Sequence, residues 1–277
     1  MAQLFYKFYY MFRKNLILIL LLHLMMSLCA QEAINDTTWN QLDNQGRKQG
    51  WWKKHYPDGT IMYKGYFKDD MPCGLFSRYF ENGETKALMD YYPDGISAYT
   101  RLFYMNGALA AEGKYVNTQK DSIWKYYSYY SQTLSYIETY SDGKKNGLST
   151  KYYTNGQVAE YLDWKSDMKH GDWLQFYEDS TLRLSAHYTD NELDGPYRVY
   201  NAQSQLIIDG KYVQSRLDGT WQYYNDDGQL EYELYYENGK LLNDAVLEEK
   251  VMKFMEEVEK NLGTIPEPDL ENIIPER

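Results

Sequence analysis

Apolar and polar side chains alternate in short runs along most of this chain. In the segment 182–189, LRLSAHYT, every second residue is apolar and the residues between them are polar. This period of two is typical of a β-strand with one buried and one solvated face. Because similar runs follow one another with short polar segments between them, the pattern predicts an antiparallel meander.

The runs belong to an internal repeat. Neighbouring copies start 24 residues apart, and six of them start with a glycine: Gly50, Gly74, Gly147, Gly171, Gly195 and Gly219. Two further copies lack this glycine; Ala98 stands in one, and Ile123 starts the other after one inserted residue. We therefore predict an all-β fold, an elongated antiparallel meander of about eight β-hairpin repeats over residues 47–242.

A turn signal divides each copy into two strands. Five copies carry Asp-Gly or Asn-Gly nine residues after the start, with the glycines Gly59, Gly83, Gly107, Gly156 and Gly228. Such pairs favour a two-residue hairpin turn, because they tolerate the positive φ angles that it requires. The other three copies have Gln132, Ser180 or Ser204 instead, and we expect looser or wider turns there.

The second strand of every copy carries a large aromatic residue 17 positions after the start. This column is Phe67, Tyr91, Tyr115, Tyr140, Trp164, Tyr188, Tyr212 and Tyr236. Six positions earlier stands Ile61, Thr85, Leu109, Leu134, Val158, Leu182, Leu206 or Leu230. The even separation places both columns on one face, which we predict to be buried. First-strand rings at Trp52, Phe76, Trp173, Tyr197 and Trp221 should join them in a stacked ladder.

The period changes to 3.6 after the repeats, which predicts an amphipathic helix over residues 243–263. Its apolar face would be Val246, Leu247, Val251, Phe254, Met255, Val258 and Leu262. The simplest role of this helix is to cap the open edge of the last hairpin, and docking of a partner is the alternative. Residues 264–277 contain three prolines and are expected to form a flexible tail.

The first thirty residues resemble a signal peptide. Arg13 and Lys14 precede the apolar run Leu16–Leu22, and small residues lead to a cleavage point near Ala30/Gln31. Met1 or Met11 could be the start. An uncleaved membrane anchor and a lipoprotein modified at Cys29 are weaker alternatives, because the run is short for a bilayer and Leu28 is bulky. Residues 31–46 would then form an N-terminal cover, anchored by Trp39.

Cleavage would change both the charge and the cysteine content of the chain. The net charge falls from −11 to about −14, because residues 1–30 hold three basic residues and no acidic one. An acidic surface disfavours nucleic acid and anionic lipid as partners. Cys73 would remain as the last cysteine, and we expect it to be a small loop residue without an intrachain disulfide. The exported chain would be periplasmic, secreted or on the outer surface, without a membrane span.

No motif in the sequence indicates a reaction, a metal or a cofactor. His55, His170 and His187 occupy unrelated repeat positions without metal-ligand spacing. The chain has 31 tyrosines, more than the buried columns absorb, and exposed ones give rigid contact area. As a candidate binding surface we take Tyr66, Tyr92, Tyr127, Tyr161 and Tyr235. We expect a non-enzymatic scaffold for an unknown protein partner, with a glycan as the alternative ligand.

Two segments, 143–156 and 218–228, resemble the MORN repeat variant, Asp/Asn-Gly-Lys-x-x-Gly-x-Trp-x-x-Tyr-x-x-Asn-Gly. The resemblance extends from about residue 46 to residue 241. It implies hairpin arrays, many of them from bacterial envelopes and often labelled antitoxin-like; eukaryotic relatives act as protein scaffolds, and some are proposed to bind phospholipid. The acidic charge departs from the lipid-binding members, and the signal peptide departs from a cytoplasmic antitoxin.

Overall fold

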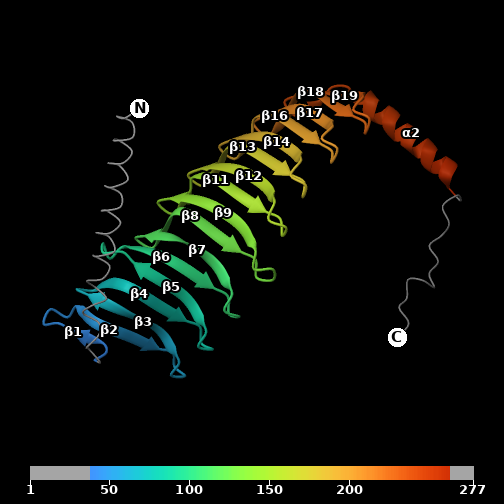
Figure 1. Ribbon diagram of the computed structural model, residues 1–277. Coiled ribbons are helices and arrows are strands. Elements are labelled where there is room, and N and C mark those ends of the chain that lie inside the picture. Colours follow the sequence, from blue (N-terminus) through green and yellow to red (C-terminus); the bar gives the residue numbers. More distant parts are fainter. Residues whose placement is uncertain (1–37, 263–277) are drawn as a thin grey trace, which may run out of the picture. The chain divides into compact units, whose positions relative to one another are not determined.

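The structure is a computed structural model that describes residues 38–262 (Figure 1). The chain divides into two compact units, Met1–Gly171 with Phe176–Ser180, and Asp172–Gln175 with Thr181–Arg277. The predicted signal peptide and the predicted tail lie outside the described residues, as does the start of the predicted N-terminal cover.

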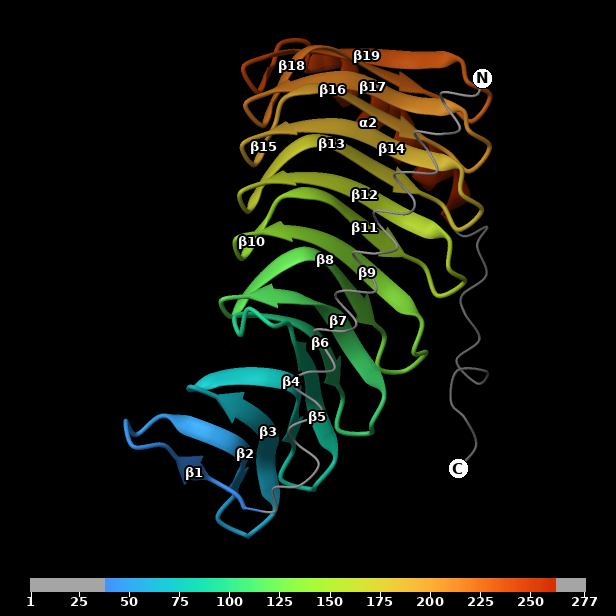
Figure 2. The same cartoon turned by 60° about the vertical axis from the view of Figure 1, so that its left-hand side comes forward.

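The first unit consists of consecutive antiparallel strands. They are β1 (Gln41–Leu42), β2 (Lys48–His55), β3 (Ile61–Lys68), β4 (Met71–Tyr79), β5 (Thr85–Tyr91), β6 (Ser97–Phe103), β7 (Leu109–Val116), β8 (Gln119–Tyr127), β9 (Leu134–Ser141), β10 (Lys144–Lys145), β11 (Gly147–Tyr152) and β12 (Val158–Lys165). From β2 to β12, consecutive long strands pair with each other. The short strands β1 and β10 pair antiparallel with β2 and β9 (Figure 2). The predicted all-β antiparallel meander is therefore confirmed in this unit.

The second unit repeats the same plan and ends in a helix. Its elements are β14 (Leu182–Thr189), β15 (Glu192–Leu193), β16 (Gly195–Tyr200), β17 (Leu206–Val213), β18 (Arg216–Tyr224), β19 (Leu230–Glu237), β20 (Lys240–Leu241) and α2 (Ala245–Asn261). Strand β13 (Met168–Phe176) has residues in both units. The long strands pair antiparallel in chain order. Asp244 caps α2, because its side chain accepts a hydrogen bond from the N–H of Ala245.

The strand register places the opening residue of a copy opposite its aromatic residue 17 positions later. Gly50 pairs with Phe67, and Gly219 pairs with Tyr236. In the fourth copy it is Ser122, not Ile123, that pairs with Tyr140 and has a positive φ of 58°. The predicted start at Ile123 is therefore wrong by one residue. The inserted residue lies instead in the turn of residues 128–133, which is one residue longer than the turn of residues 56–60.

The turns differ from the predicted two-residue type. The N–H of Tyr56 donates to the carbonyl of Thr60, and the N–H of Gly59 donates back to the carbonyl of Tyr56, at 2.8 and 3.0 Å. The loop therefore has three residues, of which Gly59 alone has a positive φ, as in a type I turn followed by a bulge. Two-residue turns with two positive φ angles occur instead between copies, for example at Asp69 and Asp70.

The three turns without glycine are not all wider. The N–H groups of Ser180 and Ser204 donate to the carbonyls of Tyr177 and Asn201, three residues earlier, as in the glycine turns. Only the expectation for Gln132 is right among the three, since its N–H reaches the carbonyl of Ser128, four residues earlier. Serine here adopts the left-handed conformation that glycine adopts elsewhere, with a φ of 62° at Ser204.

Rings from both strands of a copy meet on one face, which we name the ladder face. Its contacts run Trp52–Phe67–Phe76–Tyr91 and Tyr115–Trp124 in the first unit, and Tyr197–Tyr212–Trp221–Tyr236 in the second. Centroid separations lie between 4.7 and 6.3 Å, and most pairs meet edge to face. The second-strand ring of one copy thus covers the first-strand ring of the next copy.

At several junctions of the ladder face a small residue lies opposite a large one in the neighbouring copy, and we call this pattern the size rule. Gly113 lies directly opposite Trp124 in the next strand, and a Cβ atom on Gly113 would lie 2.4 Å from the indole ring. Gly65 beneath Phe76 and Gly210 beneath Trp221 repeat this arrangement. A Cβ atom on either glycine would lie 2.0 or 2.4 Å from the nearest ring carbon. Where the first-strand residue is small, its neighbour is large: Thr100 lies opposite Met89. By the register of β9 and β11, Ser149 faces Glu138 in the same way.

Two details concern the N-terminal part. Trp39 packs on Trp51 with ring centroids 5.9 Å apart, and the N–H of Asn40 donates to the carbonyl of Trp51. Cys73 lies on strand β4, so the expectation of a loop residue is wrong. It is disulfide-bonded in the full-length chain, whereas the expectation of no disulfide concerns the chain after cleavage of residues 1–30.

Replacing Gly113 tests the size rule. Gly113→Ala should lower the free energy of unfolding by about 1–3 kcal/mol, because the added methyl group overpacks against Trp124. The pair Gly113→Met with Trp124→Thr copies the Met89–Thr100 pair, so its loss in urea unfolding should be smaller than the sum of the two single losses. Strictly additive losses would contradict the rule.

The turns at Ser204 and Gly228 form a matched pair, since both residues lie three positions after an asparagine, donate to its carbonyl and have a positive φ. Ser204→Gly should raise the free energy of unfolding by up to about 1 kcal/mol, whereas Gly228→Ser should lower it by about 1–2 kcal/mol. Thermal unfolding of the two single variants checks this. A change of the same sign in both would show that φ does not decide their stability.

Candidate binding surfaces

A cavity of about 470 Å³ opens in the first unit beside the irregular fourth copy. The residues that line it are Tyr104, Tyr126, Tyr127, Ser128, Ser135, Tyr136 and Glu138. They come from the end of β8, from the start of β9 and from the turn after β6. We call this cavity the tyrosine pocket.

The inserted residue sits at the rim of the tyrosine pocket. The longer turn holds Tyr129 and Tyr130, whose ring centroids lie 5.2 Å apart. Tyr129 also packs edge to face on Tyr104, which lines the pocket, at 5.0 Å. Tyr130 is 92 % exposed, so its ring is open to solvent. The longer turn thus places two aromatic rings beside the cavity.

Hydrogen bonds hold the pocket tyrosines in place. The hydroxyl of Tyr104 donates to the carbonyl of Tyr127 at 2.8 Å, and the hydroxyl of Tyr127 donates to Oε1 of Glu112 at 2.7 Å. Burial and this bond to Glu112 raise the pKa of Tyr127 to about 12. The hydroxyl of Tyr126 accepts from Nζ of Lys120 at 2.7 Å. Because their hydroxyls are bonded, these rings are rigid walls.

Glu138 places a carboxylate at a ladder position that elsewhere holds glycine, alanine, methionine or leucine. It forms an ion pair with Lys145, and the hydroxyl of Tyr140 donates to its Oε2 at 2.7 Å. Partial burial opposes ionisation, but the hydrogen bonds from Lys145 and Tyr140 outweigh it and lower the pKa of Glu138. Glu138 is therefore an ionised acceptor at neutral pH. Burial also lowers the pKa of nearby Lys120.

This chemistry suits binding. The lining supplies rings, hydroxyl groups and one carboxylate already paired with a lysine. It contains no histidine, cysteine or second carboxylate. In residues 38–262 no group of three or more His, Cys, Asp or Glu side chains is placed to hold a metal ion.

The five tyrosines chosen from the sequence have different surroundings. Tyr127 lines the tyrosine pocket, and Tyr235 lines a groove in the second unit. Tyr66 packs on Trp51, and Tyr161 packs on Phe176, with centroids 5.7 and 5.6 Å apart. Tyr92 lies beneath Nζ of Lys114.

The sequence analysis missed Tyr104, Tyr136 and Glu138 as site residues. The usable signals were the single inserted residue and the one acidic side chain at that ladder position. Neither indicates a pocket until the strand register brings the turn after β6 beside β8 and β9.

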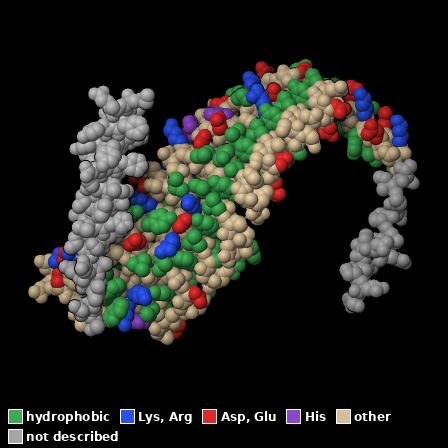
Figure 3. Space-filling model, in the orientation of Figure 1, with side chains coloured by type: hydrophobic (Ala, Val, Ile, Leu, Met, Phe, Trp, Pro, Cys, Tyr) green, Lys and Arg blue, Asp and Glu red, His purple; other side chains and the backbone are tan. Residues whose placement is uncertain are grey.

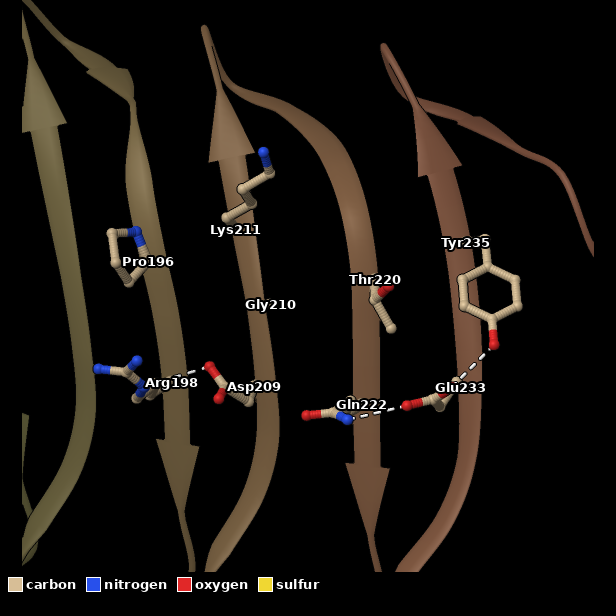
Figure 4. Close-up of a pocket in the computed structure, with 9 residues that line it drawn as sticks. All are labelled: Pro196, Arg198, Asp209, Gly210, Lys211, Thr220, Gln222, Glu233 and Tyr235. Carbon is tan, nitrogen blue, oxygen red and sulfur yellow. Dashed lines mark hydrogen bonds and ion pairs between the residues drawn. The ribbon is translucent and has the colours of Figure 1, made fainter.

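The groove that contains Tyr235 has a volume of about 550 Å³ and lies in the second unit (Figure 4). Its polar side chains bond one another across the strands. Arg198 pairs with Asp209 at 3.1 Å, while Glu233 accepts from Gln222 and from Tyr235, both at 2.8 Å. These groups are bonded to one another within the protein.

Helix α2 carries an exposed apolar stripe, which we name the α2 apolar face. It comprises Leu247, Val251, Phe254, Met255 and Val258, with exposed fractions between 37 and 63 %. Lys250 ties α2 to β19 through an ion pair with Glu231 and by lying over the ring of Tyr232. Charged side chains of both signs are visible on α2 in Figure 3. No helix in the described part of the chain has the length and hydropathy needed to cross a membrane.

Comparisons with known proteins place these hairpins in a family. A search of curated proteins gave no match. The family model of the MORN repeat variant matches residues 48–69, 145–166, 217–238 and 231–245. The first three matches begin two residues before Gly50, Gly147 and Gly219, which is the same position of the repeat. The matched segments are therefore MORN repeat variants, as the sequence motif indicated.

Proposed function

We propose that this chain is an exported, non-enzymatic scaffold that binds a protein partner through the α2 apolar face. The observation that carries the proposal is the exposure of that face, since no side chain of α2 is buried. Soluble proteins rarely leave a contiguous apolar stripe in water unless it meets a partner. The repeat array would hold the helix in position.

The charges on α2 specify the partner. Its polar side carries Glu248, Glu249, Glu256, Glu257 and Glu259 against Lys250, Lys253 and Lys260. An amphipathic helix with an acidic polar side fits an apolar groove flanked by basic residues. Anionic lipid would be repelled by the same side, so a membrane surface is a poorer partner than a protein. Under the antitoxin-like label, this chain would be the neutralising partner of such a protein.

A photo-crosslinking amino acid at position 254 of the full chain tests this in the cells that produce it. We expect one protein to be linked at position 254 and not at position 256 on the opposite side of α2. Val251→Asp should abolish the link, because it places a charge in the apolar contact. The purified partner should then bind the chain directly, and should present an apolar groove with basic flanks.

Other outcomes of this experiment reject the proposal. A link to lipid, a link to a second copy of the chain, or equal labelling at positions 254 and 256 would each do so. Circular dichroism of Val251→Asp guards against a folding defect, since the strands should be unaffected.

Export is tested separately by mass spectrometry of the chain from the cell envelope or medium. We expect a protein that begins near Gln31 and has lost the basic residues Arg13 and Lys14. Leu20→Arg interrupts the apolar run and should leave a full-length protein in the cytoplasm. A full-length chain outside the cytoplasm would contradict cleavage.

A further inference from the structure

We propose that the tyrosine pocket is a second, separate binding site that takes an uncharged sugar unit of an oligosaccharide. This goes beyond the proposed function, because the pocket lies in the first unit and does not involve α2. Its volume of about 470 Å³ falls within the range of small-ligand sites.

The lining matches the two sides of a sugar ring. A pyranose has a face of C–H groups, which packs on aromatic rings, and an edge of hydroxyl groups, which needs polar partners. Tyr104, Tyr126 and Tyr136 supply rings, and Tyr136 is 43 % exposed. Ser128, Ser135 and the Glu138 carboxylate supply the polar partners. Tyrosine combines an apolar body with a polar tip, which suits such a ligand.

The charges decide against ionic ligands. Tyrosine rings beside a carboxylate could also form a cage for an ammonium group. Glu138, however, is already paired with Lys145, and Lys120 lies close by on Tyr126. A cationic ligand would compete with Lys145 and be repelled by Lys120, whereas an anionic ligand would meet the Glu138 carboxylate. A neutral ligand can donate hydroxyl groups to Glu138 without breaking its ion pair.

The pocket side chains are held rigidly, and the rim residues enlarge the site. Tyr104 and Tyr127 have hydroxyl groups bonded inside the protein, so little side-chain freedom remains to be lost on binding. Tyr129 and Tyr130 continue the aromatic surface outward from Tyr104. The ligand is therefore a chain of sugar units, with one unit in the pocket and the next on the rim.

The test is calorimetric titration of the full chain with soluble tetrasaccharides of glucose, mannose and N-acetylglucosamine, alongside choline and a sulfated tetrasaccharide. We expect at least one neutral tetrasaccharide to bind. Tyr136→Ala should weaken that binding at least tenfold, and Tyr130→Ala should weaken it less. Tyr235→Ala is the matched control, since Tyr235 is equally exposed at 43 % but lies in the second unit, and it should bind as the unchanged protein does.

The inference is overturned if no neutral tetrasaccharide binds, if choline or the sulfated sugar binds better, or if Tyr136→Ala and Tyr235→Ala weaken binding equally. Deleting Ser131 restores the common turn length and should remove the rim contribution while the strands stay folded. Val251→Asp should leave sugar binding unchanged. The crosslinking experiment therefore reports on the scaffold proposal, and the sugar titration reports on the tyrosine pocket.

Discussion

The contact between a ring on one strand and a small residue on the next strand is the constraint on which both units depend. Each hairpin has an apolar face but no second layer of its own to cover it. Trp124 is fully buried because Gly113 lets the indole ring lie against the backbone of the neighbouring strand. Burial therefore arises at the junction between copies, and each copy is stabilised mainly by its neighbours.

This constraint explains which parts of the fold were predictable. The ring column and the opening glycines recur because the junction repeats, so period and strands could be derived from the sequence. The two columns predicted to be buried are mostly half-buried, and Leu230 is 50 % exposed. The start of the fourth copy could not, because Ser122 adopts the positive φ of a glycine and so hides the register. The lengths of the turns at Ser180 and Ser204 were mispredicted for the same reason, because the backbone conformation there follows the strand register more than the residue type.

The tyrosine pocket could not be predicted from the sequence for a different reason. Tyr104 and Tyr136 belong to different copies, and their proximity to Glu138 depends on where the inserted residue falls. Alignment of the glycines placed the insertion before Ile123, whereas it widens the turn of residues 128–133. A shift of one residue moves side chains to the opposite face of a strand, so a pocket cannot be derived until that register is known. The helix was predictable because its period is local.

Junction-based stability also indicates where an array of this kind can acquire a specific site. A change within one copy is tolerated when the facing residue compensates for it, and Glu138 facing Ser149 keeps the size rule while replacing an apolar pair by a charged one. Lys145 and Tyr140 then satisfy the carboxylate locally, so the disturbance does not spread to other junctions. The irregular copy is thus the place where the chemistry of the ladder face differs, and under our proposal this copy binds the ligand while its neighbours support it.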